Sequence, residues 1–137
     1  MRVTVCELPD EAEALSAAWD GLRRHSVEQR SELLLLPEFA FAPPLWQSPQ
    51  FDAERWAQAE AATDAWLQRL PELQARFVVG ARPVKRGGKP YNEGFLWSAA
   101  TGLVALRSMR SIWSRSPSSC IACIAWPNPI GSSPSKS

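Results

Sequence analysis

The feature that most constrains this 137-residue chain is an unbroken run of four leucines, residues 33–36, closed by Pro37 and a carboxylate, Glu38. Such a run is too short for a stable helix, but it has the length of a strand buried on both faces, as parallel strands covered by helices are. Pro37 lacks an N–H and keeps the preceding residue extended, so we expect the strand to end there. This places Glu38 at the carboxyl end of a strand, the edge at which open α/β sheets bind ligands.

The surroundings of Glu38 give it two interpretations. Beside apolar neighbours such as Phe39 and Phe41, a carboxylate can act as a general base near neutral pH. The alternative is that it only caps the following turn, since carboxylates in such settings also have structural roles. The loop over residues 40–51 is rich in apolar side chains and is expected to line a substrate pocket through Phe39, Phe41 and Trp46. Trp46 has a second interpretation, packing onto the body of the domain or a dimer interface.

Two amphipathic helices flank this strand. The first is expected over residues 10–30, with Asp10 and Glu11 opening it in the manner of a cap. Its apolar face is formed by Leu15, Ala18, Trp19 and Leu22. The second begins after Asp52, a predicted N-cap, and is expected to end or kink at Pro71. Its apolar stripe contains Trp56, Ala59, Thr63, Trp66, Leu67, Leu70 and Leu73, and aromatic residues in such a stripe are typical of core packing.

A β-hairpin is predicted between residues 79 and 95, because Gly87-Gly88 supplies the positive φ angles of a tight primed turn. Lys85, Arg86 and Lys89 cluster at its tip and are expected to be solvated. A phosphate-binding loop is excluded, because no Gly-Lys-Ser/Thr opens a helix there.

The order of these segments resembles the nitrilase, or carbon-nitrogen hydrolase, superfamily. That family opens with a strand, a long helix and an apolar strand ending in Pro-Glu, as residues 2–8, 10–30 and 33–38 do here. A strand ending in Val79-Gly80 and a strand running from Tyr91-Asn92 into residues 101–104 continue the pattern. The resemblance covers residues 1–106. It implies an α/β fold, the N-terminal part of a nitrilase-like αββα sandwich, with a mixed sheet and helices on the outer face.

The resemblance also implies a Glu-Lys-Cys triad that hydrolyses small-molecule amides or nitriles without a cofactor or metal. Glu38 matches the general base. The segment that matches the family's lysine motif, residues 106–113, has no lysine, and no elbow for the nucleophilic cysteine follows. We therefore expect this chain to be truncated and inactive. An acyl-transferring branch of the same superfamily uses the same glutamate and is one alternative. Family members commonly pair through their helices, so a homo-oligomer is expected.

Composition changes abruptly after residue 106. All 14 acidic residues lie at or before Glu93, whereas residues 107–137 hold ten serines, four prolines and four cations. We divide the chain into a partial hydrolase domain, 1–106, and a non-homologous tail, 107–137. One interpretation is a frameshift, because suitable codons for 107–115 read Lys-His-Ala-Lys-His-Leu-Val-Pro in another frame, similar to the family's lysine segment. The rivals are a natural truncated protein and a non-catalytic binding module with a basic tail.

The cysteines, the charge distribution and the apolar segments bear on possible partners and on the location of the protein. Cys6 is expected to face the interior, and Cys120-x-x-Cys123 lacks a second ligand pair for zinc. Four scattered cations make a weak nucleic-acid footprint, so no nucleic-acid partner is expected. We expect no membrane association and a cytoplasmic location. If half of a sandwich is missing, an apolar sheet face should be exposed, through residues such as Val78, Phe95 and Leu96.

Overall fold

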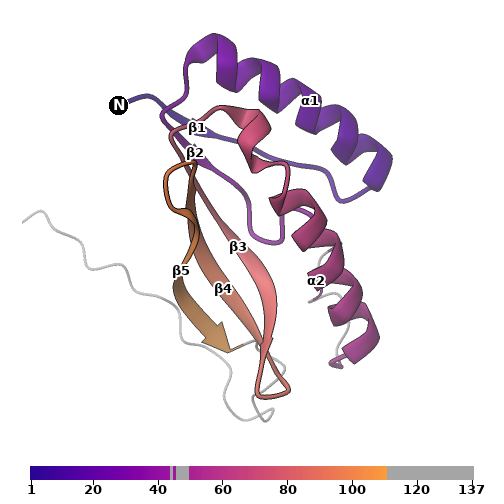
Figure 1. Ribbon diagram of the computed structural model, residues 1–137. Helices are drawn as coiled ribbons and strands as arrows, with labels where there is room; N and C mark the ends of the chain where they lie inside the picture. Colours follow the sequence, from indigo (N-terminus) through magenta and orange to yellow (C-terminus); the bar gives the residue numbers. More distant parts are fainter. Residues whose placement is uncertain (44, 46–49, 111–137) are drawn as a thin grey trace, which may run out of the picture.

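The computed structural model describes residues 1–43, 45 and 50–110 as one α/β unit (Figure 1). Its elements, in chain order, are β1 (Val3–Val5), α1 (Ala12–Gln29), β2 (Leu33–Leu35), α2 (Ala53–Leu67), the 3-10 helix η2 (Leu70–Leu73), β3 (Phe77–Arg86), β4 (Lys89–Ser98) and β5 (Gly102–Arg110). Residues 44, 46–49 and 111–137 lie outside the described part, and so does the predicted tail apart from its first four residues.

The five strands form one mixed sheet in the order β1-β2-β3-β4-β5. The first three are parallel, with Leu34 between Thr4 and Val78 in register. The β3–β4 and β4–β5 pairs are antiparallel. Parallel neighbours need a crossover, and α1 and the α2–η2 segment provide the two crossovers. The expected fold class, a mixed sheet with helices on its outer face, is confirmed.

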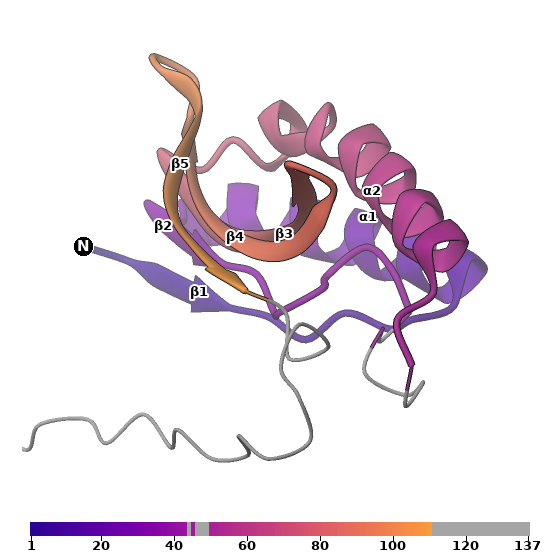
Figure 2. The ribbon, with the colours of Figure 1, turned by 90° about the horizontal axis from the view of Figure 1, so that it is seen from below.

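Both helices lie on the same side of the sheet (Figures 1 and 2). The core between the layers joins Leu15, Trp19 and Leu22 of α1 to Leu34, Val78, Phe95 and Trp97 of the sheet and to Leu67, Leu70 and Leu73. The predicted apolar faces of the two helices are therefore confirmed as core. A second cluster, around Trp56, packs the start of α2 against Ala42 and Leu45 of the preceding loop.

Local signals in the sequence explain where these elements begin and end. The Asp52 carboxylate accepts hydrogen bonds from the backbone N–H groups of Glu54 and Arg55, at 3.0 and 3.1 Å, so the predicted N-cap is confirmed. The cap predicted for α1 is wrong, since Glu11 occupies the N-cap position without a side-chain hydrogen bond. Pro71 lies in η2, after α2 has ended.

The hairpin of β3 and β4 turns at the predicted pair of glycines, which have φ angles of 57° and 73°. The last strand differs from expectation. What the sequence indicated as one strand from Tyr91 to Val104 is two, β4 and β5, joined by a turn over residues 99–101. β5 extends to Arg110 and so runs across the proposed domain boundary at residue 106.

Within the described residues, helices cover only one face of the sheet (Figure 2), and this corrects two expectations. β2 is not buried on both faces, because Leu34 is fully buried whereas Leu33 and Leu35 are partly exposed on the other side. Val78 and Phe95 point into the helix-covered core and are fully buried, so they do not form the exposed apolar face. Leu96, which alternates with them, does belong to that face and is partly exposed.

Candidate functional site

Glu38 lies just beyond the carboxyl end of β2, as the Pro37 signal predicts. The backbone N–H of Leu36 still donates to the Val79 carbonyl at 2.9 Å, and the chain then leaves the sheet in a turn over residues 38–41. Phe39 adopts a left-handed conformation, with φ of 51°, immediately after the carboxylate. A bulky residue in this conformation costs about 1–3 kcal/mol, and such strain clusters at functional sites.

The carboxylate of Glu38 reaches across the sheet to β4. The side-chain amide of Asn92 donates to Glu38 Oε1 at 2.6 Å, joining residues 54 positions apart. Glu38 is exposed, and among the described residues its other oxygen accepts no hydrogen bond. The amide oxygen of Asn92 is buried and has no partner in the same part of the chain. One carboxylate oxygen is thus anchored while the second remains available to a proton donor.

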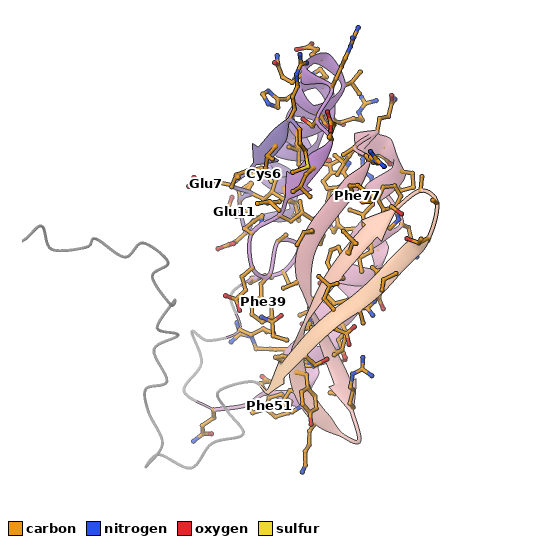
Figure 3. The ribbon with its side chains drawn as sticks, turned by 90° about the vertical axis from the view of Figure 1, so that its left-hand side faces the viewer. Cys6, Glu7, Glu11, Phe39, Phe51 and Phe77 are labelled. Atoms are coloured by element: carbon orange, nitrogen blue, oxygen red, sulfur yellow. The ribbon has the colours of Figure 1, made fainter. Side chains whose placement is uncertain are left out.

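The predicted pocket residues have different surroundings from those expected. Phe41 is buried in the core, where its ring stacks on Trp66 at 5.8 Å and meets Trp19 edge-on at 5.8 Å. Phe41 is therefore part of the core, and its role beside Glu38 stays a prediction. Phe39, labelled in Figure 3, lies just after Glu38. Its ring packs edge-on against Trp56, with ring centroids 6.3 Å apart, and its role toward a substrate stays a prediction. Trp46 lies outside the described residues.

Cys6, the cysteine that the structure describes, is not an activated nucleophile. Cys6 is the residue after β1, and its side chain packs against the core. The thiol donates a hydrogen bond to the Leu35 carbonyl at 3.4 Å. Burial raises the pKa of the Cys6 thiol to about 11. With this pKa, the thiol stays protonated near neutral pH. It is inert because only a thiolate is a strong nucleophile. Cys120 and Cys123 fall outside the described part.

A buried ionic cluster on the helix side of the hairpin was not predicted from the sequence. The carboxylate of Glu93 on β4 is fully buried and accepts two hydrogen bonds from Arg82, at 3.1 and 2.8 Å, one from Arg86 and one from Ser108 at 3.1 Å. Burial favours the protonated form, but the hydrogen bonds and the charge of Arg82 outweigh it and lower the pKa of Glu93. Arg86 is therefore not simply a solvated residue of the hairpin tip.

A shallow cleft of about 310 Å³ opens near this cluster, between the end of α2 and the sheet. Its lining residues are Asp64, Leu67, Gln68, Pro71, Arg82, Trp97 and Leu103, and Glu38 is not among them. Within the described ranges no group of His, Cys, Asp and Glu is arranged to hold a metal ion. Neither α-helix of this part of the chain is both long enough and apolar enough to cross a membrane.

No model of a known protein family matches the sequence, and no curated protein matches it. Among solved structures, the chain is similar to a double mutant of the amidase from Nesterenkonia sp. AN1 in complex with acrylamide. The two share 18% identity over 85% of this chain, with a TM-score of 0.49. The match covers 45% of the amidase chain, so the present chain spans less than half of its length. The likeness is one of fold alone.

Proposed function

We propose that the chain is the N-terminal portion of a carbon-nitrogen hydrolase that acts on amides or nitriles, with Glu38 as its general base. The observation that supports this most is the hydrogen bond between Glu38 and Asn92. The Pro-Glu and Tyr-Asn segments were singled out separately in the sequence as features of that superfamily. In the fold their side chains meet at 2.6 Å, at the carboxyl edge of the parallel strands.

The proposed mechanism uses the two oxygens of the Glu38 carboxylate differently. Asn92 fixes Oε1 of Glu38, and the free Oε2 takes the proton of a cysteine thiol. The thiolate then attacks the amide or nitrile carbon, and a cation stabilises the charge that develops on the substrate. With an amide, Glu38 returns the proton to the nitrogen, which leaves as ammonia, and water then hydrolyses the thioester. With a nitrile, the proton goes to the nitrogen of a thioimidate, a first water releases ammonia to give the thioester, and a second water hydrolyses it. The rigid sheet gives the carboxylate its position, since both anchor points lie on or directly beside strands.

We propose that neither the nucleophilic cysteine nor the lysine of the triad is among these 137 residues. The Cys6 thiol is protonated and hydrogen-bonded within the sheet, so it does not serve as the nucleophile. The segment at the position of the family's lysine motif runs Leu106-Arg107-Ser108-Met109 and continues without a lysine to Trp113. The chain as it stands is therefore proposed to be inactive.

The test is ammonia release from short aliphatic amides and nitriles. The 137-residue chain should remain at background, because removing one member of a catalytic unit abolishes most of its rate advantage. A chain in which residues 1–106 continue in the alternative reading frame should release ammonia. Turnover by the 137-residue chain that Glu38→Gln leaves unchanged would contradict both the role of Glu38 and the incomplete site.

The acyl-transferring alternative uses the same carboxylate and is separated by the product. With an amine present, a hydrolase yields the free acid, whereas an acyltransferase yields the N-acylated amine. Mass spectrometry of the product of the frame-restored chain distinguishes these outcomes. The binding-module alternative predicts neither product.

A further inference from the structure

Within residues 1–43, 45 and 50–110, no helix lies over the face of the sheet that points away from α1 and α2 (Figure 2), and much of this face is apolar. Strand alternation and the pairing register show which side chains point away from the helices and so lie on this face. Its apolar members, hereafter the open face, are Val3, Val5, Leu33, Leu35, Phe77, Val79, Leu96, Val104 and Leu106. All nine are exposed or half-buried, whereas the hairpin end of the same sheet face carries the polar residues Lys85 and Asn92. Figure 3 looks onto this face, with Phe77 labelled.

The exposed apolar side chains are concentrated on the sheet and not on the helices, which indicates that the sheet is the interaction surface. Val3, Val5, Val104 and Leu106 are large exposed hydrophobic residues of the open face, whereas the described helices contribute only Val27 to that class. Contiguous apolar patches of this kind mark interaction sites in soluble proteins. The helix-mediated pairing that the family resemblance implies has no comparable apolar surface in α1 and α2.

We propose that the open face binds the open face of a second copy of this chain, forming a two-layer β-sandwich across a two-fold axis. A patch of nine apolar side chains suits an apolar sheet and does not suit nucleic acid or a charged peptide. Every copy of the chain carries such a sheet, and two sheet faces pack about 10 Å apart with their side chains interdigitated. The same patch then serves on both partners, as in isologous dimers.

The area of the open face is large enough for a weak but specific dimer interface. Five strands about 4.8 Å apart, over roughly 20 Å of strand length, give an area of about 500 Å². Two such faces bury about 1,000 Å², which reaches the lower range of specific interfaces. The dimer should therefore be of moderate affinity and dependent on concentration.

Charges at the two ends of the open face select one orientation. Arg76, exposed at the amino end of β3, holds its guanidinium 5.1 Å from the centre of the Phe77 ring. Glu7 and Glu38 are exposed at the opposite end, after β1 and β2. A two-fold axis perpendicular to the strands brings Arg76 of each copy toward the carboxylates of the other. An axis along the strands places like charges together, which is unfavourable.

The chain offers a matched pair of variants for the test. Val104 on the open face and Val27 on α1 are 44% and 43% exposed, so a glutamate at either site costs the monomer little. Sedimentation should show the wild-type chain as a dimer at micromolar concentration. Val104→Glu should raise the dissociation constant at least ~100-fold, because each dimer then buries two unpaired carboxylates. Val27→Glu should leave the dimer unchanged.

A second substitution guards against a folding defect at Val104. Val5→Glu replaces a side chain that is 73% exposed at the edge of the sheet, and it should dissociate the dimer with an unchanged far-UV CD spectrum. A wild-type monomer, or dissociation by Val27→Glu alone, would overturn the proposal. So would a monomer whose β1 and β5 amides are protected from hydrogen exchange, since another part of the same chain would then cover the face. None of these outcomes depends on the proposed hydrolase function.

Discussion

Glu93→Gln should lower the free energy of unfolding by about 2–4 kcal/mol. Glu93 is 0% exposed, and its carboxylate is the common acceptor for Arg82, Arg86 and Ser108. Glutamine keeps the shape but removes the charge and turns an N–H₂ group toward one of the arginines. Removing one partner of a buried ion pair typically costs 3–5 kcal/mol, because the other charge is left uncompensated.

The exposure of the two arginines reduces that figure. The side chain of Arg86 is 57% exposed and regains water when its partner is lost, whereas that of Arg82 is only 24% exposed and does so incompletely. Most of the cost should therefore arise at Arg82, and Glu93→Leu combined with Arg82→Leu should recover part of the loss. Exposed pairs contribute only about 0–1 kcal/mol, so the loss of the Arg86 pair adds little and the total stays below the full cost of a buried pair.

Urea unfolding followed by far-UV CD, at one protein concentration, measures this loss. The matched control is Glu72→Gln, the same substitution in an ion pair with Arg69 whose side chains are 38% and 35% exposed. The control should lose at most about 1 kcal/mol. A loss below about 0.5 kcal/mol for Glu93→Gln, or an equal loss for both variants, would refute the argument that burial makes the Glu93 cluster the stronger one.

Three further measurements test the packing and the electrostatics. Gly80→Ala should lose about 1–3 kcal/mol, because a Cβ there would lie 2.8 Å from the Phe95 ring, whereas Gly21→Ala, with nothing within 4 Å, should gain up to about 1 kcal/mol in the same denaturation assay. The lowered pKa of Glu93 contributes stability that is present above its usual value of 4.5 and is lost as the pH falls through the folded-state pKa, so acid titration of the unfolding free energy should fall below about pH 4.5 and flatten in Glu93→Gln. Alkylation of Cys6 at pH 8, read by peptide mass mapping, should be far slower than that of a free thiol, because its pKa is about 11, and labelling at the free rate would contradict its burial.

Local signals in the sequence were sufficient for most of the element pattern. Pro37 ends β2, the Asp52 carboxylate caps α2, and the positive φ angles of Gly87 and Gly88 close the hairpin, because each effect depends on neighbours within a few residues. The prediction of a side-chain cap at the start of α1 was wrong, because residue type alone does not ensure that the Glu11 side chain makes a hydrogen bond.

Long-range contacts were beyond this kind of reasoning. Alternation shows that Phe95 and Leu96 lie on opposite faces of the sheet, but not which face the helices cover, and so Phe95 was assigned to the wrong one. Glu93 and Ser108 are 15 residues apart, and Glu38 and Asn92 are 54 apart. Only the pairing of β4 with its neighbours brings these side chains together, and no local pattern encodes it.

The central claim, that Glu38 is the general base of a carbon-nitrogen hydrolase fold, is tested most directly by the kinetics of matched glutamate variants. In the frame-restored chain, kcat/KM for amide hydrolysis should fall by about 10²–10⁴ in Glu38→Gln, the usual contribution of a general base. Glu32→Gln, an exposed glutamate just before β2, should leave it unchanged. Full activity in Glu38→Gln, or an equal loss in both variants, would contradict the account.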